Sequence, residues 1–187
     1  MKKLIIVFFI LFLVVSLCFF DTKQDYYIPK PESLVKIEIP DSSTSQYTDE
    51  KISFKYSNST SVNLKDNFYC LNYPQYSSSI SFKINPLIDI DLELYNFENS
   101  ISIHEKQGAY INANVIQDTS ENIYGVLCYL EGNKIATSSQ FFITDSTKFF
   151  VRGGLDFDCA ITPEIEIQNI IMKKEILKFI ESFQWID

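Results

Sequence analysis

Apolar and polar residues alternate along much of the chain, with the two-residue period of a half-buried β-strand. In residues 34–39, three aliphatic side chains alternate with Lys36 and Glu38. Such alternation, or a short apolar run ended by a turn sequence, predicts strands at 34–39, 52–56, 68–73, 80–84, 123–130, 135–144 and 147–157. Hairpin-type connections at 131–133 and 145–146 join the last three, so we expect these strands to be antiparallel neighbours.

Two other segments show the three- and four-residue spacing of an amphipathic helix. The apolar stripe of 92–107 also carries His104, and residues 109–116 either extend this helix or return to a strand. The second helix follows Thr162 as N-cap, with Pro163 in its first turn. Its predicted apolar face contains Ile167, Ile170, Ile171, Leu177, Ile180 and Phe183, and its solvent face contains Lys173, Lys174, Glu175, Lys178 and Glu181.

The order of these elements predicts the fold class. Short strands, a helix, three antiparallel strands and a closing helix are typical of an α+β fold, an antiparallel sheet with flanking helices. The closing helix followed by residues 182–185 resembles the end of PsbP/Mog1-like domains. We therefore expect one α+β domain spanning residues 34–187.

Residues 1–17 have the build of an export signal, because two lysines precede an uncharged, almost wholly apolar run at 4–20. Cys18 ends the sequence 15–18, which resembles a bacterial lipobox, the site of lipid attachment. Leu17 stands where a lipobox has a small residue, so an uncleaved signal anchor is the alternative. Residues 18–33 then provide the lipid attachment and a proline-containing tether. Either arrangement holds the domain at a membrane, outside the cytoplasm.

Composition and charge exclude several classes of protein. The chain is 46% apolar and 15% aromatic, which is too hydrophobic for a disordered polypeptide. Without residues 1–17 it has 14 basic and 24 acidic residues, a net charge of −10. Nucleic acid is therefore not an expected partner, because binding to phosphates requires clustered positive charge. The same acidity disfavours docking on an anionic membrane surface, so attachment depends on Cys18 or on an uncleaved anchor.

The sequence carries no recognisable catalytic or cofactor-binding motif. A nucleophile elbow, a P-loop and an H-E-x-x-H zinc motif are all absent from it. The one histidine, His104, lies on a helical apolar stripe, where a hydrogen-bonded structural role is favoured. Helix capping explains the acids Asp89, Asp91 and Glu93 better than a metal site does. We expect no enzyme activity, no cofactor and no metal.

Three cysteines remain after Cys18, an odd number without a C-x-x-C pair: Cys70, Cys128 and Cys159. One disulfide among them is compatible with export, but the sequence does not select a pairing. Cys128 lies in an apolar run and fits a buried thiol.

The most distinctive stretch is 145–154. Asp145 is suited to opening a tight turn with an Asx hydrogen bond. Arg152, Gly153 and Gly154 lie inside a predicted strand, where glycines indicate close approach by another group. A purely structural alternative is a β-bulge at the glycines, with Arg152 paired to an acid. We take these four residues and His104 as candidate contacts for a partner or ligand.

Residues 140–155, QFFITDSTKFFVRGGL, strongly resemble a sequence block of the gliding-motility lipoprotein GldD family, in which alanine usually stands at the position of Gly154. The segments 27–31, 124–127 and 180–185 resemble further pieces of that family in the same order. The resemblance implies a lipoprotein of the outer membrane that faces the periplasm and is anchored through Cys18. It also implies a role in gliding motility and type IX secretion alongside other lipoproteins of that apparatus, and it brings no catalytic residues.

Two other functions remain open. A periplasmic module that binds a small ligand or a metal, with a PsbP/Mog1-like fold, is favoured by a concave pocket containing Arg152 and His104. A hydrolytic cell-envelope enzyme requires an exposed His104 beside Asp145 and Ser146.

Overall fold

The computed structural model describes residues 43–132 and 135–186. The predicted export signal, Cys18, the tether and the predicted strand at 34–39 lie outside these residues. The described part contains ten strands: β1 Thr44–Thr48, β2 Ile52–Ser57, β3 Ser61–Lys65, β4 Phe68–Tyr73, β5 Ser78–Pro86, β6 Tyr110–Asp118, β7 Ile123–Glu131, β8 Thr137–Thr144, β9 Phe149–Phe157 and β10 Gln184–Trp185. Its two α-helices are α2 Ile90–Lys106 and α3 Glu166–Glu181.

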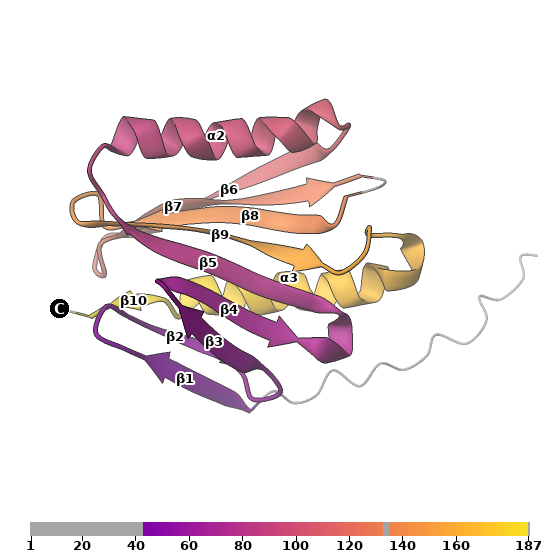
Figure 1. The fold of residues 1–187 in the computed structure, drawn as a ribbon, viewed down its shortest axis with the longest axis horizontal. Helices are drawn as coiled ribbons and strands as arrows, with labels where there is room; N and C mark the ends of the chain where they lie inside the picture. Colours follow the sequence, from indigo (N-terminus) through magenta and orange to yellow (C-terminus); the bar gives the residue numbers. More distant parts are fainter. Residues whose placement is uncertain (1–42, 133–134, 187) are drawn as a thin grey trace, which may run out of the picture. The chain divides into compact units, whose positions relative to one another are not determined.

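The strands form two antiparallel sheets (Figure 1). The larger sheet has the order β3-β4-β5-β9-β8-β7-β6, and the smaller has the order β1-β2-β10. The predicted hairpin partners β7, β8 and β9 are antiparallel neighbours. The sequence therefore predicted an α+β fold correctly, whereas the second sheet was not expected.

The two helices lie on opposite faces of the large sheet, as two consecutive residues of β8 demonstrate. Phe141 packs against Phe179 of α3, with ring centroids 5.6 Å apart. Phe142 packs against Phe97 of α2 at 5.0 Å. Successive side chains of a strand point to opposite faces, so α2 and α3 must cover different sides of β8.

The main core lies between the large sheet, α3 and the small sheet, and it is rich in aromatic side chains. Phe179 is fully buried, with ring centroids 4.9 Å from Phe82 of β5 and 5.0 Å from Phe54 of β2. Tyr69 of β4 stacks on Phe82 at 4.7 Å. Offset-stacked and edge-to-face pairs of this kind add to the energy of apolar burial, so α3 fastens the small sheet to the large one.

The first predicted helix is confirmed as α2, and residues 109–116 return to a strand, β6. The Asp89 side chain accepts a hydrogen bond from Leu92 N at 3.1 Å, which is an N-cap, and Asp91 and Glu93 occupy the first turn. These acids therefore have the predicted capping role, in which negative charge opposes the helix dipole.

The buried face of α3 differs from the predicted one. Ile171, Ile180 and Phe183 are buried as expected, but Ile167, Ile170 and Leu177 are exposed. Their places in the core are taken by Met172, Ile176 and Phe179. Apolar residues occur all around this helix, so its sequence alone does not determine which face is buried. Packing against β2, β5 and β8 selects the buried face.

The start of α3 also differs. Pro163–Ile165 forms a 3₁₀ turn, and Thr162 makes no side-chain capping hydrogen bond to it. The α-helix begins only at Glu166. Pro163 therefore begins the 3₁₀ turn and not, as predicted, the first turn of the α-helix.

Candidate functional site

Asp145 closes the turn between β8 and β9. Its Oδ1 accepts hydrogen bonds from the backbone N–H groups of Thr147, Lys148 and Phe149, at 2.8 to 3.0 Å. Partial burial raises the pKa of this carboxyl, but the three backbone hydrogen bonds outweigh it, so the pKa lies below its usual range. The predicted Asx turn is confirmed, and the carboxylate is engaged by its own loop.

The neighbouring strands approach both glycines of β9 closely, Gly153 more tightly than Gly154. A Cβ on Gly153 would lie 2.4 Å from Ser81 O of β5 and 2.7 Å from Cζ of Phe141. A Cβ on Gly154 would lie 2.9 Å from Ser139 O of β8. The expected close approach is therefore made here by the protein's own backbone and by Phe141. The irregularity in register lies in β8, between Thr137 and Ser139, and not at the glycines.

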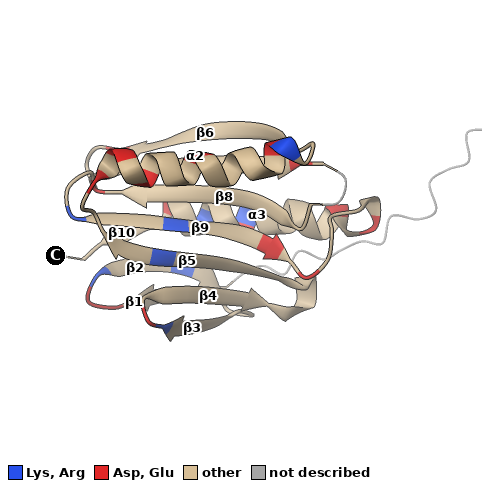
Figure 2. Cartoon of the chain, turned by 45° about the horizontal axis from the view of Figure 1, so that its top comes forward, with Lys and Arg blue, Asp and Glu red and all other residues tan. Residues whose placement is uncertain are grey.

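Arg152 lies directly opposite Lys83 of β5 in the antiparallel register. The ladder continues from Lys83 to Phe68 of β4 and from there to Lys65 at the end of β3. Figure 2 shows basic positions side by side on β5 and β9, beside the part of the sheet over which α2 lies. The ion pairs found among residues 43–132 and 135–186 include neither Lys83 nor Arg152. The acid partner that the purely structural alternative assigns to Arg152 is thus not found among the described residues.

A shallow concavity of about 340 Å³ lies beside these two cations. Lys83 and Arg152 themselves line it, together with Gln140, Gly153, Gly154 and Asp156 among others. Asp156 accepts a hydrogen bond from Thr137 Oγ1 at 2.6 Å. A Cβ on Gly154 would lie 3.9 Å from Asp156 Oδ2, so this carboxylate leans along β9 towards Arg152. The ion pairs found among the described residues do not join the two. The arrangement can bind an anionic group at the Lys83–Arg152 end.

His104 does not line this concavity. It is half-buried at the C-terminal end of α2, and its Nε2 lies 3.0 Å from Nε2 of Gln140. The amide of Gln140 also contacts Ser100 Oγ, at 2.8 Å. The hydrogen bond predicted for His104 is present, whereas its Nδ1 is buried without a partner among the described residues. Gln140, which also lines the concavity, connects the two.

His104 and Asp145 lie at different ends of α2. The N-terminal end of α2 is tied to the β8–β9 turn, because Leu87 N donates to Lys148 O at 2.8 Å. His104 stands about four helical turns away, roughly 20 Å along the axis. The arrangement of His104 beside Asp145 and Ser146 that a hydrolase would need is therefore not formed.

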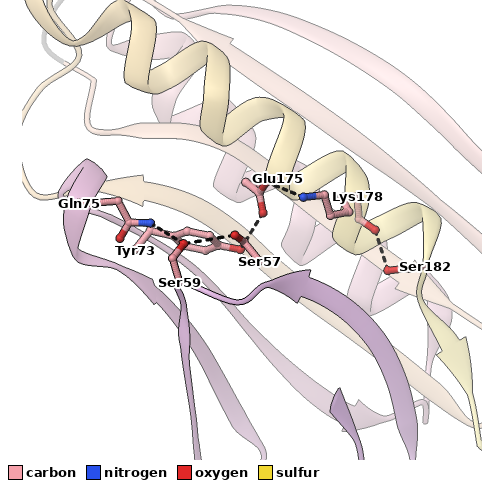
Figure 3. Close-up of polar contacts among 7 residues, drawn as sticks. All are labelled: Ser57, Ser59, Tyr73, Gln75, Glu175, Lys178 and Ser182. Carbon is pink, nitrogen blue, oxygen red and sulfur yellow. Dashed lines mark hydrogen bonds and ion pairs between the residues drawn. The ribbon is translucent and has the colours of Figure 1, made fainter. Parts of the chain in front are cut away.

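A polar cluster on the other face of the sheet has a structural role (Figure 3). Tyr73 of β4 donates to Glu175 of α3 across 3.5 Å, and Lys178 pairs with Glu175 at 2.7 Å. Burial, and then the charge of Glu175, raise the pKa of Tyr73. Gln75 Nε2 donates to Ser59 Oγ at 3.0 Å nearby. The Tyr73–Glu175 hydrogen bond links β4 to the middle of α3, and Lys178 holds the Glu175 side chain in place.

Cys70, Cys128 and Cys159 are all free thiols. Cys128 is 4% exposed, as the apolar run around it predicted, and burial raises the pKa of its thiol. Among the residues that the structure describes, no three His, Cys, Asp or Glu side chains are grouped to hold a metal ion. No helix in the same residues has the length and apolar character needed to cross a membrane.

Lys83 is the residue of this site that the sequence did not single out. It lies in a strand that alternates cleanly, where an outward lysine is ordinary. Only the register between β5 and β9 places it against Arg152. A pairing of distant strands leaves no local signal in the sequence, so the pair could not have been found from it.

A family model described as "Gliding motility lipoprotein GldD" matches residues 24–185. No curated protein matches the chain. Among solved structures, the chain is similar to the solution structure of cyanobacterial PsbP (CyanoP) from Synechocystis sp. PCC 6803, with a TM-score of 0.50 and 14% identity. That similarity covers 83% of this chain and 98% of the cyanobacterial one, and at this identity it shows a PsbP-like fold alone.

Proposed function

Because the chain belongs to the gliding motility lipoprotein GldD family, we propose that it is a membrane-tethered component of the gliding machinery and of the associated type IX secretion machinery. It acts without catalysis, through contacts with other lipoproteins of that apparatus. The observation that carries this proposal is the family match over residues 24–185. The site supports it, because the candidate acid and histidine are occupied by structural hydrogen bonds.

The proposed anchor is a lipid on Cys18. Residues 1–17 are the signal peptide, residues 18–33 the attachment and tether, and residues 34–187 the domain. The lipid places the domain on the periplasmic side of the outer membrane, and an uncleaved anchor in the inner membrane is the alternative. Labelling of cells with an alkyne fatty acid tests this: the wild-type chain takes up label and Cys18→Ala does not. Equal labelling of both chains contradicts lipid attachment.

Deletion of the gene tests the assembly role. We expect loss of surface movement, or accumulation of type IX cargo inside the cell, and restoration of both by the wild-type chain. A deletion strain that moves and secretes like its parent contradicts the role. Crosslinking in native membranes, with mass spectrometry of the captured chains, then identifies which lipoproteins contact the domain.

The contact surface that we propose contains Lys83, Arg152, Gly153 and Gly154, which all line the concavity. Two adjacent cations without an acid partner among the described residues favour a partner that presents carboxylates there. Arg152→Gln and Lys83→Gln should weaken movement or secretion while the protein stays at its normal level. Lys174→Gln, which removes an exposed lysine from α3, is the matched control. If all three variants behave alike, this surface is not the contact.

A small anionic ligand in the concavity is the second candidate. The cavity of about 340 Å³ beside Lys83 and Arg152 favours it, and the two cations favour an anion over a metal ion. Titration of the purified full-length protein with inorganic phosphate and with citrate tests this candidate. Stabilisation by either anion that disappears in Arg152→Gln supports a ligand, and unchanged thermal unfolding argues for the protein contact.

A further inference from the structure

The strand β6 lies at one edge of the large sheet and leaves half of its backbone groups without a strand partner. It pairs with β7 over nine consecutive residues, Tyr110–Asp118, without a shift in register. In an antiparallel ladder every second residue directs its N–H and C=O away from the paired strand. The free edge of β6 therefore presents a row of hydrogen-bonding groups roughly 30 Å long.

The sequence and register of β6 lack the features with which proteins usually prevent strand addition, as far as the described residues extend. Such features are prolines, lysines, bulges, short length or a covering segment. β6 contains neither proline nor lysine, and its only charged residue is Asp118 at its end. The opposite edge, β3, is five residues long and ends at Lys65 followed by Asp66. Within residues 43–132 and 135–186, one edge of this sheet is thus protected, and the other has no neighbouring strand.

Exposed apolar side chains lie on β6 and beside it. Val115 is 80% exposed and Tyr110 is 69% exposed. A groove of about 740 Å³ runs beside β6 and is also lined by Leu177 and Ile180 of α3. A strand added to β6 would place alternate side chains in this groove, where Leu177, itself an exposed apolar residue, would be covered.

The charge of the groove indicates what kind of segment fits it. The charged residues that line it are three acids, Asp118, Glu121 and Glu181, and one base, Lys55. The acids favour an incoming segment that carries a lysine or arginine at the Asp118 end. The middle of the groove favours apolar side chains at every second position.

We propose that β6 accepts an extended segment of a partner protein as an added strand, with apolar residues in alternation and a basic residue that faces Asp118. The inference rests on the proposed role in protein contacts and adds the mode of one contact. Backbone hydrogen bonds supply the affinity, and the groove selects the side chains.

Two exposed tyrosines allow a matched crosslinking test in cells with the full-length chain. A photoreactive benzoylphenylalanine replaces Tyr110 at the β6 edge or, as the control, Tyr95 on the outer face of α2, which is 61% exposed. We expect a crosslinked partner from Tyr110 at a yield at least about ten times that from Tyr95. Mass spectrometry should place the crosslink in a segment with apolar alternation and a basic residue. A second copy of this chain as the product, a segment without that pattern, or equal yields from both positions overturns the proposal.

Blocking the edge gives a second readout. Ala113→Lys combined with Val115→Lys puts lysines on exposed positions of β6, where they oppose strand pairing. The yield from Tyr110 should fall at least about ten-fold, while Ile103→Lys on α2, which replaces a 55% exposed isoleucine, leaves it unchanged. A yield that survives the β6 lysines overturns strand addition.

The same strains separate this inference from the proposed function. If the deletion strain loses movement or secretion but Tyr110 captures no strand-like segment, the inference fails and the function stands. If Tyr110 captures the predicted segment while the deletion strain moves and secretes normally, the function fails and the inference stands.

Discussion

Arg152 of β9 lies directly opposite Lys83 of β5, and the ion pairs found in the described part of the chain leave both without an acid. Like charges in opposed positions destabilise an antiparallel pair. The arrangement is notable in a chain with a formal net charge of −8, where acids are plentiful. A cost in stability that the fold does not need is the expected mark of a contact surface.

Replacing Lys83 should therefore separate stability from function. Lys83→Gln removes the repulsion, and Lys83→Glu turns it into a cross-strand ion pair. We expect the free energy of unfolding to rise by about 0.5 to 1 kcal/mol in Lys83→Glu, with Lys83→Gln between it and the wild type. Movement or secretion should fall in the same order. Urea unfolding measures the first effect, and a Lys83→Glu protein less stable than the wild type contradicts the argument.

The glycines of β9 should differ in their tolerance of a methyl group. Gly153→Ala places Cβ 2.4 Å from a backbone oxygen and 2.5 Å from Cβ of Phe82, so strands must move apart, and we expect a loss of about 2 kcal/mol. Gly154→Ala meets only Ser139 O closer than 3.0 Å and should cost about 1 kcal/mol or less. Thermal and urea unfolding of the two variants test this order, and equal losses count against it.

The phase of α3 can be tested with two alanine substitutions. Phe179 is fully buried among aromatic rings, so Phe179→Ala should cost about 3 to 5 kcal/mol. Ile170 is 48% exposed, so Ile170→Ala should change the free energy of unfolding by no more than about 0.5 kcal/mol. The apolar face predicted from the sequence would bury Ile170. If Ile170→Ala lost as much stability as Phe179→Ala, the predicted face would be the correct one.

Asp49 should make part of the stability depend on pH. Its carboxylate accepts hydrogen bonds from the Tyr69 hydroxyl at 2.6 Å and from Lys51 N at 2.8 Å and Ile52 N at 3.0 Å. Burial raises its pKa, but these bonds outweigh the burial and lower the pKa below 3.8. The folded state thus favours the ionised form, so this contribution is present above the unfolded pKa and is lost as pH falls through the folded one.

Asp49→Asn tests this dependence. At pH 7 the variant should be less stable by about 1 to 2 kcal/mol, the lower part of the range for hydrogen bonds to a charged group, because Asp49 is only partly buried. The difference from the wild type should shrink as pH falls from about 4 towards 2. Urea unfolding of both proteins at pH 7 and pH 3 measures this difference. If the variant is less stable than the wild type by the same amount at both pH values, the effect comes from side-chain packing and not from charge.

Several parts of the fold follow from local sequence. Pro74 ends β4 where the apolar run predicted, Asp89 caps α2, and Asp145 folds its own turn. Each of these depends on a side chain and a backbone group at most four residues away. Such contacts are nearly independent of the rest of the chain, and this is why periodicity and turn chemistry identify them.

Other parts needed the assembled molecule. The sequence determined that this is an α+β domain, where most strands lie, and which residues resemble a family. The tertiary structure decided which face of α3 is buried, brought Lys83 opposite Arg152, and left β6 at an open edge. The physical reason is that local contacts depend on neighbouring residues alone. The buried face of a helix, strand register and strand order depend on how distant segments pack into one core.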